Sequence, residues 1–248
     1  GWTWTSLRDI NTLLEYSVNC KDLDVRNRYD ALARFFRAYF YFEKIKRFGD
    51  VPWYSKPIGS ADPELKRPRD SREYVMQRMI EDIDFAIRYL PTKHDLYRIT
   101  KWTALALKSR FCLFEGTFRK YHGIADETID GVTISADYFL QLAADAAWAV
   151  MEQNKYSLYK GNTLKLDAPY REYFILEDGD AKETILSMRF NADILVRHGI
   201  QFTFRNMRHS ATQRLVNHYL MADGSKIQDQ PGYETMTYNQ QFQNRDPR

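Results

Sequence analysis

A dense aromatic segment that ends at a proline turn limits the possible folds more than any other feature of this 248-residue sequence. Between residues 31 and 48, apolar side chains fall on both sides of a helix with 3.6 residues per turn. They are Leu32, Phe35, Phe36, Tyr39, Phe40 and Phe42. Such a helix must be covered by other helices and cannot lie on a surface. Basic residues are expected to keep one edge of it in water. They are Arg34, Arg37, Lys44, Lys46 and Arg47.

The end of this helix is marked by two residues. Gly49 suits the position just after a helix, and Pro52 cannot continue one. Trp53 and Tyr54 are therefore expected on the loop beyond the helix end.

The block resembles the first helical repeat of the SusD/RagB family of nutrient-binding lipoproteins of Bacteroidetes. In that family an Arg-Phe-x-Arg-Ala-Tyr-x-Tyr-Phe helix, here residues 34–42, runs into Arg-Phe-Gly-Asp-Val-Pro, here residues 47–52. Further family motifs follow in the same order. They are residues 68–75, 80–91, 98–116, 212–224 and 242–248. Family members are commonly about twice as long, so the chain is expected to be a portion of one.

The resemblance implies a mainly α fold of tetratricopeptide-like helical pairs, with irregular loops and a few short strands. Residues 1–248 are expected to form a single SusD-like helical domain. Within it, residues 1–153 carry the helical repeats and residues 154–248 are loop-rich with one further helix. The spacing of the helices is too irregular for a strict repeat.

Apolar periodicity predicts the positions of the other helices. They span approximately residues 7–14, 70–90, 100–115, 135–153 and 212–222. Asp70 and Glu73 fit a capping box, and Gly116 suits the end of its helix. Trp102 and Trp148 lie within helices and are expected in the core. Residues 156–159 and 183–190 alternate as short strands do.

Composition excludes several function classes. The 36 basic and 33 acidic residues are interspersed and leave a net charge of +3, so the sequence shows no basic patch of the kind that binds nucleic acid. Cys20 and Cys112 carry neither a disulfide framework nor metal-ligand spacing. No apolar run approaches the length of a membrane-spanning helix.

Catalytic signatures are equally scarce. The sequence has no Gly-x-Ser-x-Gly, no phosphate-binding glycine loop and no His-Glu-x-x-His. Its densest carboxylate cluster is formed by Glu81, Asp82 and Asp84. These residues fall on a predicted helix and are expected to form its solvent-exposed face. We therefore expect no enzyme activity, no catalytic residues, no metal and no cofactor.

A protein that binds sugars instead needs flat aromatic rings on loops, with polar groups nearby. Trp53 and Tyr54 fit that need best, and Trp2 and Trp4, before the first helix, are next. The alternative is that a tryptophan beside a proline turn packs over the helix end.

The resemblance implies a glycan-binding protein at the outer-membrane cell surface. It would be held by an N-terminal lipid anchor outside this chain. It would deliver an oligosaccharide or polysaccharide to a SusC-like TonB-dependent transporter. Two alternatives remain: a tetratricopeptide-like adaptor that binds only protein, and a RagB-type protein that binds peptides.

Overall fold

The computed structural model describes residues 2–161, 168–190, 199–206 and 210–245. The chain divides into two compact units. The first contains residues 1–157 and 181–187, and the second contains residues 158–180 and 188–248. The first boundary lies close to residue 154, where the sequence changes character, while the single-domain assignment stays a prediction.

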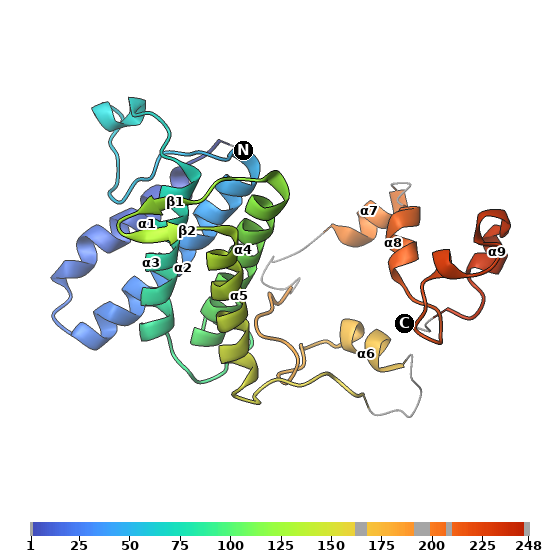
Figure 1. Ribbon diagram of the computed structural model, residues 1–248. Helices are drawn as coiled ribbons and strands as arrows, with labels where there is room; N and C mark the ends of the chain where they lie inside the picture. The colour runs from blue at the N-terminus through green and yellow to red at the C-terminus, as the bar shows by residue number, and fades with distance from the viewer. Residues whose placement is uncertain (1, 162–167, 191–198, 207–209, 246–248) are drawn as a thin grey trace. The chain divides into compact units, whose positions relative to one another are not determined.

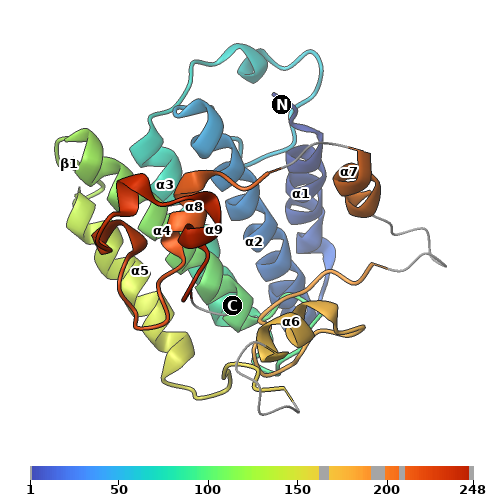
Figure 2. The ribbon, with the colours of Figure 1, turned by 90° about the vertical axis from the view of Figure 1, so that its right-hand side faces the viewer.

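Five helices build the first unit, and each packs on the next in chain order (Figures 1 and 2). They are α1 (Thr5–Tyr16), α2 (Leu23–Phe48), α3 (Arg72–Tyr89), α4 (Lys101–His122) and α5 (Ala136–Met151). Short 3-10 turns follow α1 (Ser17–Asn19) and precede α3 (Pro63–Lys66). The predicted mainly α fold of helical pairs is confirmed.

The strands of this unit form one small hairpin between α4 and α5. β1 (Glu127–Ile129) pairs antiparallel with β2 (Val132–Ile134), with Thr128 opposite Thr133. Residues 156–159 and 183–190 form no strand, against prediction. They make single hydrogen bonds, such as Ser157 N to Lys182 O (2.8 Å) and Ser187 N to Leu96 O (2.8 Å), and a ladder needs several.

Side chains fix the beginnings of the helices largely as expected. Thr100 and Thr103 form a capping box on α4, and the Ser135 side chain accepts a hydrogen bond at the start of α5. The predicted role of Asp70 is wrong, because Ser71 caps α3 and the Asp70 carboxylate instead accepts a hydrogen bond from Trp53 N (2.7 Å).

Gly116 does not end its helix, against prediction. α4 continues to His122 and stops at Gly123, which adopts the left-handed conformation. Gly116 instead faces α5, where an added Cβ would lie 2.8 Å from Leu140 Cγ. The glycine allows α4 and α5 to approach closely.

The aromatic helix α2 is covered on only part of its circumference. Phe35 and Phe42 are buried, but Phe36 is 42% and Tyr39 47% exposed, so the expectation that every aromatic residue is covered is wrong. α1 and α3 pack on two sides of α2 and leave a third side open. Trp148 of α5, predicted in the core, is likewise 62% exposed, whereas Trp102 is buried as predicted.

Two of the basic residues predicted on a wet edge of α2 are buried. Lys44 lies over the rings of Phe40 (4.9 Å) and Trp4 (5.3 Å), and burial, with a smaller effect from Arg47, lowers its pKa. Arg37 is buried beside Asp82 of α3, whose assignment to a wet face is also wrong. Arg37 Nε lies 2.6 Å from Asp82 Oδ2, and Nη2 lies 2.8 Å from Oδ1.

A second buried network joins α3 to α4 and the hairpin. Arg72 Nε donates to Glu115 Oε2 (2.7 Å), and Arg119 Nη1 donates to Glu73 Oε1 (2.7 Å). Arg119 also donates to the carbonyl of Ile134 on β2 (3.2 Å). The hairpin is thereby held against the helices.

The second unit contains short helices within its described residues. They are α6 (Ala168–Ile175), α7 (Ile200–Asn206), α8 (Gln213–His218) and α9 (Tyr238–Gln241), with 3-10 turns at Ile227–Asp229 and Tyr233–Thr235. The prediction of one further helix over residues 212–222 is therefore wrong in number and length, although Thr212 does cap α8. Arg245 links the end of the described chain to the residue after α8 by donating to the carbonyl of Tyr219 (2.5 Å).

Across the parts of the chain that the structure describes, every helix is too short or too polar to cross a lipid bilayer.

Replacing Asp82 with alanine should lower the free energy of unfolding by about 3–5 kcal/mol, because the Arg37 charge would remain buried without a carboxylate partner. Asp84, on the same helix, lies 2.6 Å from Lys108 with its own side chain 49% exposed. Asp84→Ala should cost no more than about 1 kcal/mol. Chemical denaturation of both variants measures the difference, and equal losses would contradict the assigned role of Asp82.

Candidate functional site

The candidate site is a cavity of about 580 Å³ in the first unit, here called the tryptophan pocket. Three segments line it: residues 2–11, which enter and begin α1, residues 52–58, which follow α2, and residues 65–69, which precede α3. Its volume lies within the range of about 300–1,000 Å³ that is typical of small-ligand sites.

Three aromatic rings form one wall of the tryptophan pocket. Trp2 and Trp4 lie 5.1 Å apart and Trp4 and Tyr54 lie 5.6 Å apart, each pair edge to face. Trp2 is 47% exposed, and Trp4 and Tyr54 are half-buried. The structure therefore brings together three of the four residues predicted as ligand-binding, from segments separated by about fifty positions of the chain.

Trp53 lies elsewhere. Its ring is 6% exposed and stacks on Tyr41 of α2 at a centroid distance of 4.2 Å. The Arg37 guanidinium lies 5.2 Å from the same ring. Trp53 packs over the end of α2, which is the alternative that the sequence left open.

The backbone that carries Tyr54 is fixed by Tyr41. The Tyr41 hydroxyl donates to Pro52 O (3.2 Å) and accepts from Tyr54 N (2.7 Å). Burial raises the pKa of Tyr41 well above its ordinary value, so the hydroxyl keeps the proton that it donates. Asp70 holds the same loop from the other side through Trp53 N.

Asn11 of α1 completes this support, and the sequence reading missed it. Its side-chain amide donates to Tyr54 O (2.9 Å) and Lys56 O (3.2 Å), while its oxygen accepts from Arg37 Nη1 (3.1 Å). The available signal was a polar residue four positions after Leu7 on the apolar face of α1.

Polar groups surround the aromatic wall. Tyr54 donates its hydroxyl to Glu64 O (3.2 Å), and burial raises the pKa of that hydroxyl. Arg67 donates to Trp53 O (3.1 Å) and pairs with Asp70 (2.9 Å). Flat rings beside amide and guanidinium donors suit noncovalent binding of a polar ligand with apolar faces. No group of three metal-ligating side chains occurs within the described residues.

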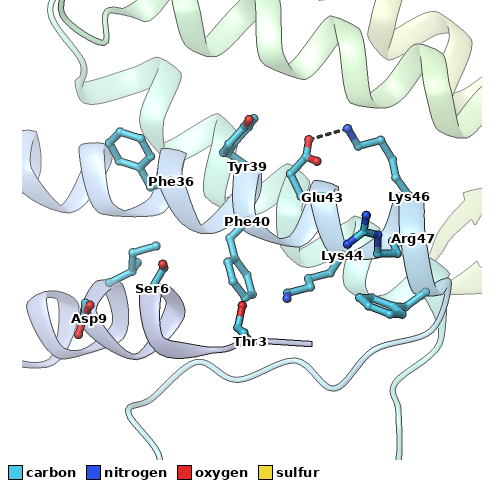
Figure 3. Close-up of a pocket in the computed structure, with 12 residues that line it drawn as sticks. Thr3, Ser6, Asp9, Phe36, Tyr39, Phe40, Glu43, Lys44, Lys46 and Arg47 are labelled. Carbon is cyan, nitrogen blue, oxygen red and sulfur yellow. Dashed lines mark hydrogen bonds and ion pairs between the residues drawn. The ribbon is translucent and has the colours of Figure 1, made fainter. Parts of the chain in front are cut away.

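A second cavity, here called the α1–α2 groove, has a volume of about 1060 Å³. Figure 3 shows Phe40 and Lys44 projecting from α2 toward α1, where Ser6 and Asp9 lie. Exposed Phe36 and Tyr39 also line it, as do Glu43 and Lys46, which form an ion pair on the side of α2 that faces away from α1 in Figure 3. The exposed rings of the groove are of the kind that is enriched at protein interfaces.

Replacing Trp53 with alanine should lower the free energy of unfolding by about 3–5 kcal/mol, since a buried ring and its stacking on Tyr41 are lost. Trp2→Ala removes a half-exposed ring and should cost much less. Thermal melting and chemical denaturation of both variants test this. A Trp53→Ala variant as stable as Trp2→Ala would contradict the packing role.

The sequence and the fold were compared with known proteins. Residues 3–113 match a SusD-like family described as starch-binding and associating with the outer membrane. No curated protein is similar enough in sequence to count as a relative.

Solved structures share the fold. A SusD-like protein from Bacteroides fragilis aligns over 97% of this chain and 46% of its own, with 22% identity and a TM-score of 0.70. A SusD-like carbohydrate binding protein from the same species aligns over 98% of this chain and 44% of its own, with 18% identity and a TM-score of 0.63. A structure containing a xylogluco-oligosaccharide aligns over 76% and 34% of the two chains, with 20% identity and a TM-score of 0.56.

The chain thus spans less than half the length of each of these structures. At these low sequence identities, the structural similarity establishes a common fold and nothing further. Residues 3–113 thus match a SusD-like family, and the fold of the chain is that of SusD-like proteins.

Proposed function

We propose that this chain captures an oligosaccharide or polysaccharide at the cell surface, with Trp2, Trp4 and Tyr54 as the ligand-contacting rings. The observation that carries the proposal is the gathering of these three rings around one cavity. The C–H groups on one face of a pyranose ring can lie against such an aromatic wall, while its hydroxyls meet polar groups at the rim.

Binding without turnover is the better account of this pocket. A glycosidase needs two carboxyl groups facing each other across the sugar, and the described residues that line the tryptophan pocket include no aspartate or glutamate. The family description and the oligosaccharide-containing relative support a role in carbohydrate binding.

Trp4→Ala and Tyr54→Ala should each weaken oligosaccharide binding about tenfold or more, a loss of about 1.4 kcal/mol, because a stacking surface disappears. Titration calorimetry against a panel that includes maltoheptaose and a xylogluco-oligosaccharide measures this. Trp148→Ala is the matched control, since Trp148 is exposed on α5 and does not line the tryptophan pocket. Unchanged affinity in both pocket variants would refute the assignment.

The same measurements, extended to peptides, distinguish a RagB-type peptide-binding protein from a glycan-binding one. If extended peptides bind with losses in Trp4→Ala and Tyr54→Ala while no saccharide binds, the ligand is a peptide. The geometry favours saccharide, because the walls are broad rings and no exposed sheet edge lies among the described lining residues.

Delivery to a SusC-like TonB-dependent transporter, from a lipid-anchored position at the outer membrane, forms part of the proposal. The α1–α2 groove is the surface that we assign to the transporter, because the large apolar side chains of Phe36 and Tyr39 remain exposed there. A purely protein-binding adaptor would use the same groove without binding sugar in the tryptophan pocket.

A Phe36→Ser/Tyr39→Ser double variant should lose co-purification with a co-expressed SusC-like transporter, while sugar affinity stays unchanged. Tyr121→Ser is the control, because Tyr121 is 81% exposed on α4, away from the lining of the groove. Undiminished co-purification of the double variant would place the transporter contact elsewhere. Co-purification without any saccharide binding would favour the adaptor.

A further inference from the structure

We propose that the tryptophan pocket selects saccharides that carry an anionic group, a carboxylate or a sulfate. This inference rests on the proposed capture of glycans and names the class of glycan. It comes from the charges around the aromatic wall, which differ sharply from those of the chain as a whole.

The lining of the tryptophan pocket is one-sided in charge. Arg8, Lys56, Arg67 and Arg69 line it, and no acidic side chain does among the described residues. Across the whole sequence 36 basic residues are nearly balanced by 33 acidic ones, so the excess is local to this cavity.

Arg67 is the one cation of this set whose charge is already matched. Its guanidinium pairs with Asp70 (2.9 Å) and approaches Glu64 (3.4 Å), and it also supports the loop through Trp53 O. Its role is to hold the wall in place. It is therefore not counted among the charges available to a ligand.

Arg8, Lys56 and Arg69 are exposed and form no ion pair with any residue that the structure describes. They come from three separate segments: the first turn of α1, the loop after α2 and the loop before α3. The Arg69 guanidinium lies 5.3 Å from the centre of the Trp2 ring. One of the three cations thus lies directly beside the ring on which a sugar would stack.

This arrangement favours an anion for two physical reasons. Three like charges around one cavity repel each other, and a bound negative group removes that repulsion. A sugar that covers the cavity also displaces water from the cations, and only a charged ligand replaces the lost hydration with ion pairs and charge-assisted hydrogen bonds. A neutral sugar gains the stacking but leaves the charges less solvated.

Matched pairs of ligands test the inference on the intact protein. Oligogalacturonate against its methyl ester isolates the carboxylate, and a sulfated galactan oligosaccharide against its desulfated form isolates the sulfate. In at least one pair the charged member should bind about tenfold or more tightly than the neutral one. The preference should shrink as salt rises from about 0.05 to 0.5 M, because the ion pairs are exposed to solvent.

Substitutions then locate the effect. Arg8→Gln, Lys56→Gln and Arg69→Gln should each lower affinity for the charged ligand about three- to fivefold, as expected for an exposed ion pair, and leave the neutral ligand nearly unaffected. Arg110→Gln makes the same charge change on exposed α4 surface outside the lining and should change neither affinity.

The two proposals fail in different ways. Equal binding of charged and neutral members, with Trp4→Ala still weakening both, overturns the preference for anions and leaves glycan capture standing. An equal loss in Arg110→Gln shows general attraction by the protein's charge and also overturns it. Absence of binding by every member of the two pairs and of the neutral panel overturns glycan capture itself.

Discussion

The buried ion pair between Arg37 and Asp82 is the interaction on which the rest of the first unit depends. Removing two charges from water is costly unless every donor and acceptor finds a partner. Both Asp82 oxygens accept from Arg37, and Arg37 Nη1 donates to Asn11 Oδ1. Since these residues belong to α2, α3 and α1, the requirement fixes how the three helices lie against one another.

The position of the candidate site depends on that pair. Asn11, which contacts Arg37, also donates to the carbonyls of Tyr54 and Lys56, while Tyr41 and Asp70 accept hydrogen bonds from the neighbouring peptide groups. Trp53 is buried beneath this loop, so Tyr54 is directed toward Trp4. A binding wall positioned by buried hydrogen bonds before the ligand arrives loses little conformational entropy on binding.

Two buried polar networks serve different ends of the same helical row. The Arg37 network supports the tryptophan pocket. The Arg72–Glu115 and Arg119–Glu73 pairs join α3 to α4, and Arg119 also holds the hairpin through the carbonyl of Ile134. Next to Glu115 of the second network, close contact at Gly116 brings α4 against α5. The open side of α2, with Phe36 and Tyr39, is left for the α1–α2 groove.

The sequence by itself determined where the helices of the first unit lie, the family that they resemble, and three of the residues that meet in the pocket. Periodicity, capping residues and proline act locally, so their effects can be predicted without the fold.

Only the tertiary structure decided which faces are buried. Asp82 and Asp84 differ by two positions on one helix, yet one meets Arg37 in the interior and the other meets Lys108 at the surface. Trp53 and Tyr54 are adjacent, yet packing against Tyr41 buries the first and leaves the second to the pocket. Burial of a side chain depends on which helices pack around it. Those contacts join residues that are distant in sequence, and the local sequence pattern carries no information about them.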